Sequence, residues 1–147
     1  MDAILLDSNV LIYAIDPRDL LKQERALAVL AALQATRKGC LSVQCLSEFS
    51  AVCIRSMKAL LTPEEAERQV KRLGQSFTVF PLTEAVVSEA LRGVRDYQFS
   101  YYDAQIWAAA RLHQVPVIFS EDFNPGVYAG VRVTNPFAAA FDLQAWL

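Results

Sequence analysis

Near its N-terminus the chain carries Ala3-Ile4-Leu5-Leu6-Asp7, an apolar run that ends in an acid. A short, continuous apolar run of this kind is typical of a strand that is buried on both faces. Similar runs lie at residues 40–43, 77–82 and 115–120, and residues 131–133 are a candidate fifth strand. Helical patterns separate them, which predicts a mainly parallel sheet covered by helices on both faces. We therefore expect one α/β domain over residues 1–147, with a four- to five-stranded sheet.

Helix start signals support this division. The clearest is Thr62-Pro63-Glu64-Glu65, with a capping threonine, proline at the first helical position and glutamate at the third. Thr83 and Ser100 are further good N-cap residues. The expected helices span residues 9–15, 19–36, 44–57, 63–75, 84–97 and 101–113.

Composition and length fit an ordinary folded domain. The 147 residues are 54% hydrophobic and 20% charged, which excludes a disordered chain. No apolar run reaches the roughly 18 residues of a membrane span, and no signal-peptide pattern opens the sequence. The odd number of cysteines has neither CxxC nor zinc-ligand spacing, which predicts reduced core thiols. We expect a cytoplasmic protein without a membrane anchor.

The net charge of −2 gives the chain no overall basic field. Nucleic-acid binders usually carry such a field, because they neutralise phosphates. Local basic pairs such as Arg37-Lys38 and Lys71-Arg72 are present, but pairs of this size are most often solvated helix faces. A cation bound by nearby acids would also offset part of the negative charge. Charge therefore neither excludes nor requires a phosphate-bearing substrate.

Four acids stand at or near apolar segments: Asp7, Glu48, Asp103 and Asp122. In an open parallel sheet, functional groups gather outside the carboxyl ends of the strands. Asp7 and Asp122 come at the ends of strands, and Glu48 lies in the helix that leaves the second strand. The helix that carries Asp103 runs back towards the fourth strand, so its N-terminus lies at the same edge. Topology thus predicts that all four acids meet there.

Charged groups near a core are costly unless they are paired or coordinate a cation. Oxygen ligands without His or Cys suit Mg²⁺ or Mn²⁺ and disfavour zinc. The single histidine, His113, is expected at the far end of its helix, interacting with the helix dipole rather than with a metal. The chain offers no Ser-His or Cys-His nucleophile, so the acids favour attack on phosphorus by a metal-activated water.

Each acid, taken alone, also has an ordinary structural interpretation. Asp7 can cap the helix that follows it, Asp103 can complete a capping box, and Glu48 can be a solvated helix residue. Asp122 can be a turn residue, and its neighbour Glu121 competes with it as a ligand. The coincidence of four acids at one edge is what favours a metal site.

Two further sets of residues are weaker candidates. Flanking polar residues can hydrogen-bond the acids, although each also suits a cap or a turn: Ser8, Asn9, Ser100 and Ser120. Aromatic residues can stack on bases, although core or interface positions are more common at helical spacing: Tyr101, Tyr102 and Trp107. Aromatic residues near the C-terminus are expected to cover part of the sheet or to join a dimer contact.

The same residues resemble the motifs of the PIN-domain ribonucleases. The stretch from Ile4 to Tyr13 is similar to the opening motif of that family, and Leu46-Ser47-Glu48-Phe49 is similar to its second acidic motif. Ser100-Tyr101-Tyr102-Asp103-Ala104 resembles the third motif, and Ser120-Glu121-Asp122-Phe123 the fourth. The size of the chain is most similar to the VapC-type toxins of bacterial toxin–antitoxin pairs.

This resemblance implies a PIN-like three-layer sandwich and a Mg²⁺- or Mn²⁺-dependent endoribonuclease. Asp7, Glu48, Asp103 and Asp122 would be both the metal ligands and the catalytic acids, and RNA would be the substrate. The resemblance also implies a homodimer, and a small cognate antitoxin that occludes the acidic pocket.

Two other functions are open to the sequence. A phosphohydrolase with Asp7 as covalent nucleophile would need a second aspartate two residues on, where this chain has Asn9, so this alternative is weak. A non-catalytic PIN-like module that binds RNA or a protein would not need all four acids. Metal-dependent cleavage products would separate that module from a nuclease.

Overall fold

A computed structural model describes residues 2–55 and 57–147 of the chain. In this part of the chain, strands form one six-stranded sheet in the order β3-β2-β1-β4-β6-β5. All neighbouring strands pair in parallel except β5 and β6, which are antiparallel. The strands are β1 (Ile4–Leu6), β2 (Gly39–Ser42), β3 (Thr78–Phe80), β4 (Val117–Phe119), β5 (Gly126–Tyr128) and β6 (Val131–Thr134).

The expected count of four to five strands is wrong, because β5 forms at residues 126–128, where no strand was predicted. Gly126-Val127-Tyr128 is too short and too mixed to show a strand pattern in the sequence. It becomes a strand by pairing with β6 across a two-residue turn in which Ala129 and Gly130 have φ of 48° and 83°. Positive φ at both central residues is the geometry that joins tightly connected antiparallel strands.

The helices of the described residues follow the predicted order. They are α1 (Ser8–Ile15), α2 (Leu20–Thr36), α3 (Val43–Cys53), α4 (Pro63–Ser76), α5 (Glu84–Tyr97), α6 (Tyr101–Leu112) and the short 3-10 helix η1 (Leu143–Trp146). The predicted capping box of α4 is present, with Glu65 N donating to Thr62 Oγ1 at 3.1 Å and Thr62 N to Glu65 Oε1 at 3.0 Å. Thr83 and Ser100 cap α5 and α6 as expected.

The prediction that α3 continues to residue 57 is wrong, since the helix ends at Cys53. The backbone N–H groups of Leu60 and Leu61 both donate to the carbonyl of Cys53, at 2.9 and 3.0 Å. This reversal of the chain occupies a carbonyl at the end of the helix and turns the backbone towards α4. Part of the predicted extension, residue 56, lies outside the described residues.

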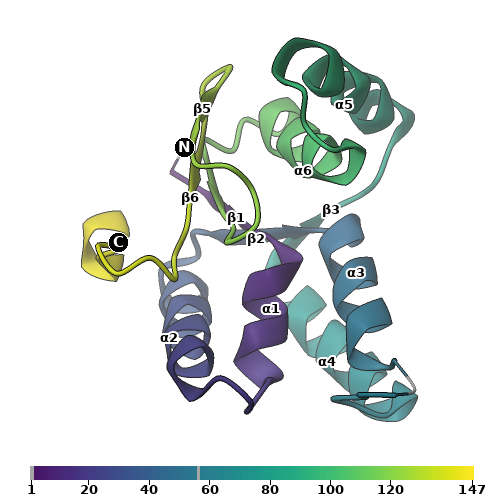
Figure 1. The fold of residues 1–147 in the computed structure, drawn as a ribbon, viewed down its shortest axis with the longest axis vertical. Helices are drawn as coiled ribbons and strands as arrows, with labels where there is room; N and C mark the ends of the chain where they lie inside the picture. The colour runs from purple at the N-terminus through teal and green to yellow at the C-terminus, as the bar shows by residue number, and fades with distance from the viewer. Residues whose placement is uncertain (1, 56) are drawn as a thin grey trace.

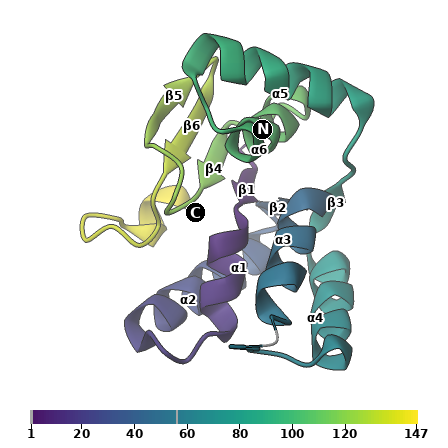
Figure 2. The same ribbon diagram turned by 45° about the vertical axis from the view of Figure 1, so that its right-hand side comes forward.

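Three layers follow from the alternation of side chains along the strands. Leu5 on β1 points into a core that it shares with α5 and α6. Its neighbours Ile4 and Leu6 point the other way, into a second core formed with α1, α2, α3 and α4. Figures 1 and 2 show α5 and α6 on one side of the sheet and α1 to α4 on the other. The expected three-layer α/β sandwich is confirmed.

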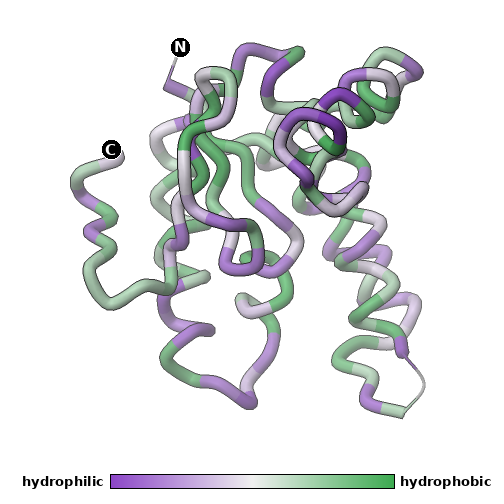
Figure 3. Tube along the Cα trace, turned by 45° about the horizontal axis from the view of Figure 1, so that its top comes forward, coloured by the Kyte–Doolittle hydropathy of each residue, from purple (hydrophilic) through white to green (hydrophobic). Residues whose placement is uncertain are grey.

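The hydropathy of the chain matches these layers. Figure 3 shows hydrophobic residues along the central strands and alternating hydrophobic and hydrophilic residues along the outer helices. Near the C-terminus, Phe141 and Trp146 pack edge-on against Phe119 of β4, with ring centroids 5.3 and 5.4 Å away. They cover part of the sheet, as predicted. Among the described helices, none is long and apolar enough to cross a membrane.

Candidate active site

Asp7 stands where β1 gives way to α1, beside the end of β4. The parallel register pairs Leu6 with Phe119, which brings the following residues, Asp7 and Ser120, side by side. Ser8 N donates to Asp7 Oδ1 at 2.7 Å, and Ser120 Oγ donates to Asp7 Oδ2 at 2.6 Å. Only 4% of Asp7 is exposed. The carboxylate therefore caps α1, as its ordinary interpretation predicted, and also lies at the carboxyl edge of the sheet.

The surroundings of Asp7 disfavour its charge. Burial raises the pKa of its carboxyl group to about 6, although the hydrogen bonds from Ser120 and Ser8 act in the opposite direction. The negative charges of Glu48 and Asp103 raise this pKa further. Two of the other predicted acids therefore lie within electrostatic reach of Asp7.

Asn9 links Asp7 to Asp122. Its amide nitrogen lies 3.4 Å from Asp7 Oδ2, 3.4 Å from Asp122 Oδ2 and 3.2 Å from Ser120 Oγ. The side-chain oxygen Oδ1 of Asn9 accepts from Glu121 N at 3.3 Å. These are long hydrogen bonds, but together they hold the segment after β4 against the first turn of α1.

Asp103 and Glu48 approach the same edge from two helices. Asp103 lies in the first turn of α6 and is half-buried, and its backbone N–H donates to Ser100 Oγ at 3.4 Å. Burial raises the pKa of the Asp103 carboxyl group, and the charge of Asp122 adds to this, whereas Ser100 lowers it. Glu48 is half-buried on α3, and its Oε1 accepts from Gln44 Nε2 at 2.9 Å.

Glu121 does not compete with Asp122 for the site. Its carboxylate accepts from the Tyr13 hydroxyl at 2.6 Å and forms an ion pair with Lys22 at 2.6 Å. Asp122 is exposed instead and faces Asn9. Of these two neighbours, Asp122 is the one at the acidic edge.

Two buried glutamines beside Glu48 were missed by the sequence analysis. Gln44 lies four residues before Glu48 on α3, and Gln105 interrupts the buried stretch of α6. For Gln105, a polar residue within the apolar run Ala104-Gln105-Ile106-Trp107 was the available signal, since a buried polar side chain needs a partner.

His113 and Trp107 lie away from the acids, as their ordinary interpretations predicted. His113 is the C-cap of α6 and stacks on Phe80 with ring centroids 4.0 Å apart. Trp107 is 1% exposed, and its indole N–H donates to the Tyr128 carbonyl at 3.0 Å. Of the three aromatic residues considered for base stacking, Tyr102 is the exposed one, at 65%.

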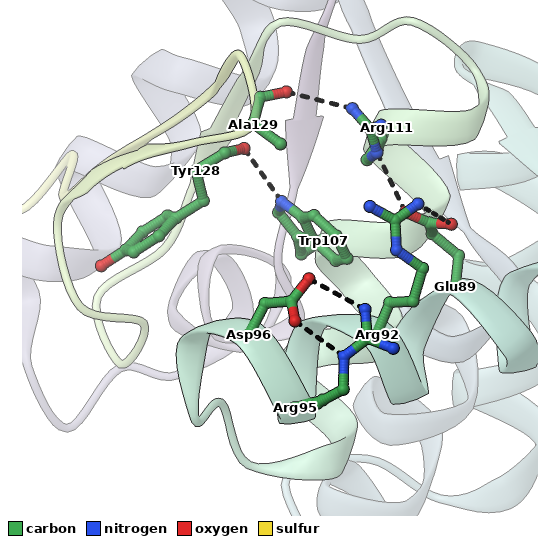
Figure 4. A network of polar contacts seen from close by, with 8 residues as sticks. All are labelled: Glu89, Arg92, Arg95, Asp96, Trp107, Arg111, Tyr128 and Ala129. Atoms are coloured by element: carbon green, nitrogen blue, oxygen red, sulfur yellow. Dashed lines mark hydrogen bonds and ion pairs between the residues drawn. The ribbon is translucent and has the colours of Figure 1, made fainter.

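A polar network attaches the β5–β6 hairpin to α6. Figure 4 shows Trp107 and Arg111 of α6 donating to the hairpin carbonyls of Tyr128 and Ala129, the latter at 3.3 Å. Arg111 also binds Glu89 of α5 at 2.9 Å. This network holds the hairpin that follows Asp122 against the helix that carries Asp103.

The donor set suits a hard cation. Within residues 2–55 and 57–147, no Lys or Arg forms an ion pair with Asp7, Glu48, Asp103 or Asp122. In the same residues, no three His, Cys, Asp or Glu side chains are close enough together to hold one ion directly. Mg²⁺ is commonly bound through one or two carboxylates and retains several waters. The oxygen donors are therefore of the type that such an ion prefers, although the described residues do not bring three of the predicted acids close enough for direct coordination of one ion.

Comparison with known proteins identifies the family to which this fold belongs. The profile of the PIN domain matches residues 4–129. No curated protein matches the sequence. Solved structures with a similar fold include the following three.

A toxin–antitoxin complex from Klebsiella pneumoniae has a TM-score of 0.63 at 19% identity, covering 92% of this chain and 98% of that chain. FitAcB from Neisseria gonorrhoeae has a TM-score of 0.62 at 24% identity, covering 91% and 98%. VapC20 from Mycobacterium tuberculosis, described as a toxin that cleaves the sarcin-ricin loop, has a TM-score of 0.62 at 16% identity, covering 82% and 90%. With the family profile spanning nearly the whole sheet and all of its flanking α-helices, the chain belongs to the PIN-domain family.

Proposed function

We propose that this protein is a Mg²⁺- or Mn²⁺-dependent endoribonuclease and the toxin of a VapBC-type toxin–antitoxin pair. One observation carries the proposal: a buried aspartate, Asp7, lies among three further acids without a basic partner in the described residues. Such an arrangement is costly unless a cation completes it. RNA as substrate is supported by the family and by the description of VapC20 as a toxin that cleaves the sarcin-ricin loop.

Asp7, Glu48, Asp103 and Asp122 would hold the ion, some of them through its bound water molecules. When bound, Mg²⁺ or Mn²⁺ activates water and stabilises the charge that develops on the phosphate. The protein's own groups keep the acids ready for that role. Ser8 and Ser120 each donate a hydrogen bond to one oxygen of Asp7. The side-chain amide of Asn9 lies between the carboxylates of Asp7 and Asp122 and contacts both.

Proton loss from Asp7 prepares the site. Because burial raises the pKa of its carboxyl group to about 6, a substantial fraction of Asp7 is protonated at pH 6. A cation binds the ionised form, so binding of the ion and release of this proton are coupled. The site is then competent at neutral pH.

A cognate antitoxin and a homodimer belong to the same proposal. The antitoxin is supported by the fold similarity to a toxin–antitoxin complex. Exposed apolar side chains on α2, Leu20 at 71% and Leu21 at 80%, leave surface for a protein partner. Three buried free cysteines accord with action in the reducing cytoplasm.

Cleavage of a generic single-stranded RNA tests the nuclease. The parent chain, Asp7→Asn and Asp103→Asn are incubated with RNA and Mn²⁺ or Mg²⁺, with and without EDTA. Asp96→Asn is the matched control, because Asp96 is an aspartate on α5 whose hydrogen-bonding partner is the exposed Arg95.

We expect metal-dependent products from the parent and the control, and a loss of at least 100-fold in both acid variants. Cleavage by Asp7→Asn at the parental rate would overturn the assignment of the site. RNA binding without metal-dependent products would instead support the non-catalytic PIN-like module.

A further inference from the structure

Two buried amide side chains connect α6 to Glu48. Gln105 is 5% exposed and Gln44 is 7% exposed. Gln105 Nε2 donates to Gln44 Oε1 at 2.6 Å, across 61 positions of sequence. Gln44 Nε2 in turn donates to Glu48 Oε1 at 2.9 Å and to the Tyr102 carbonyl at 3.0 Å. The chain of hydrogen bonds therefore runs from α6 through Gln44 to one oxygen of Glu48.

The partners of Gln44 allow its amide only one orientation. The Tyr102 carbonyl and an ionised Glu48 carboxylate can only accept hydrogen bonds, so the NH₂ group of Gln44 must face them. Rotation of the amide by 180° would direct its carbonyl oxygen at two acceptors. Gln105 reinforces the observed orientation, because it donates to the carbonyl oxygen of Gln44.

This orientation affects two acids together. The hydrogen bond from Gln44 holds Oε1 of Glu48 and leaves Oε2 without a hydrogen-bond donor among the described residues. The bond to the Tyr102 carbonyl lies immediately before Asp103, in the first turn of α6. Gln44 thereby links the helix that carries Glu48 to the helix that carries Asp103.

We propose that Gln44, held by Gln105, is a positioning residue that orients Glu48 towards the bound cation. The proposal rests on the proposed function, since it assumes that the acids bind a metal. A free glutamate on a helix surface samples several rotamers, and ordering it opposes binding. Outer hydrogen-bond partners of metal ligands remove this cost, and their loss typically weakens metal affinity 10- to 100-fold.

The test measures Mn²⁺ binding by isothermal titration calorimetry, in the absence of RNA. The main variant is Gln44→Leu/Gln105→Leu, because removing both amides leaves neither of them buried without a partner. Gln105→Leu alone is a second variant, which keeps Gln44 but removes the hydrogen bond that its carbonyl oxygen accepts. Gln23→Leu is the matched control, since the Gln23 amide also bonds across to another helix, donating to the Ala14 carbonyl of α1 at 3.3 Å. Thermal unfolding of each variant verifies that it is folded.

We expect the double variant to bind Mn²⁺ about 10- to 100-fold more weakly than the parent, with a smaller loss for Gln105→Leu and none for Gln23→Leu. The same double substitution is then made in a Glu48→Gln background, where it should cause no further loss. A structural effect unrelated to Glu48 would persist in that background.

Parental affinity in both glutamine variants would overturn the positioning role, as would a full loss in the Glu48→Gln background. If Glu48→Gln and Asp7→Asn weaken Mn²⁺ binding while the glutamine variants do not, this inference alone fails. If the parent does not bind Mn²⁺, the proposed function fails and the inference with it.

Discussion

The hydroxyl of Ser120 donates to Oδ2 of Asp7 at 2.6 Å, although the two residues are 113 positions apart. The contact exists because β4 pairs in parallel with β1, so that the residues following the two strands meet at one edge. Ser120 itself is fully buried, and its oxygen also receives the amide of Asn9 and the backbone N–H of Phe123. One hydroxyl thus organises the centre of the acidic edge.

Replacing Ser120 with alanine should shift the pH dependence of cleavage upward. The Ser120 hydrogen bond lowers the pKa of Asp7, so its removal raises that pKa, and ionised Asp7 then appears only at higher pH. The fold should lose about 1–3 kcal/mol, because three contacts to a buried oxygen disappear. Rate profiles between pH 5 and pH 9 check the shift, with Ser50→Ala on α3 as control. An unchanged profile would contradict the link between Ser120 and Asp7.

Asp7→Asn should abolish cleavage and yet stabilise the fold above pH 6. The pKa of Asp7 is raised from 3.8 to about 6, so the folded state holds this proton more tightly than the unfolded chain. Ionisation therefore costs stability as pH rises from about 4 through 6, in total about 3 kcal/mol. Asparagine removes that cost.

Urea unfolding of Asp7→Asn and of the parent, from pH 4 to pH 8 without metal, measures this difference. The advantage of the variant should grow with pH and shrink towards pH 4, where folded Asp7 is protonated and the unfolded chain, with its pKa of 3.8, is about half protonated. Asp96→Asn should follow the parent throughout. A variant that is less stable than the parent at pH 7.5 would refute the raised pKa.

Mn²⁺ should raise the melting temperature of the parent. A ligand that binds only the folded state stabilises it in proportion to the logarithm of its concentration over the dissociation constant. The increase should be absent or much reduced in Asp7→Asn and Asp103→Asn, because each removes one carboxylate charge from the site. Equal shifts in all three proteins, measured by scanning calorimetry, would mean that the cation binds elsewhere.

Loss of the carboxylate charge should affect cleavage much more at Asp122 than at Glu121. Glu121→Gln should leave cleavage within about threefold of the parent and lower stability by no more than about 1 kcal/mol, since it weakens a partly exposed ion pair with Lys22. Asp122→Asn should reduce cleavage by at least tenfold, because it removes a carboxylate beside Asn9 and Asp7. Steady-state cleavage rates of the two variants measure this difference. Similar losses in both would contradict the assignment of Asp122 to the site.

Local signals in the sequence were sufficient for most of the fold. Apolar runs located the parallel strands along the chain, and the capping residues Thr62, Thr83 and Ser100 marked three helix starts correctly. Because parallel strands share one carboxyl edge, the same signals also predicted where the four acids lie. The weak points were short segments, since β5 is a strand only through its pairing with β6.

What the sequence by itself determined is thus the α/β class, the element order and the edge at which Asp7, Glu48, Asp103 and Asp122 stand. Only the tertiary structure decided that Glu121 turns to Lys22 and Tyr13, and that Gln44 and Gln105 meet between α3 and α6. The physical reason is range: strands and caps depend on neighbours within a few residues, whereas these side chains are oriented by partners brought close through packing of the whole chain.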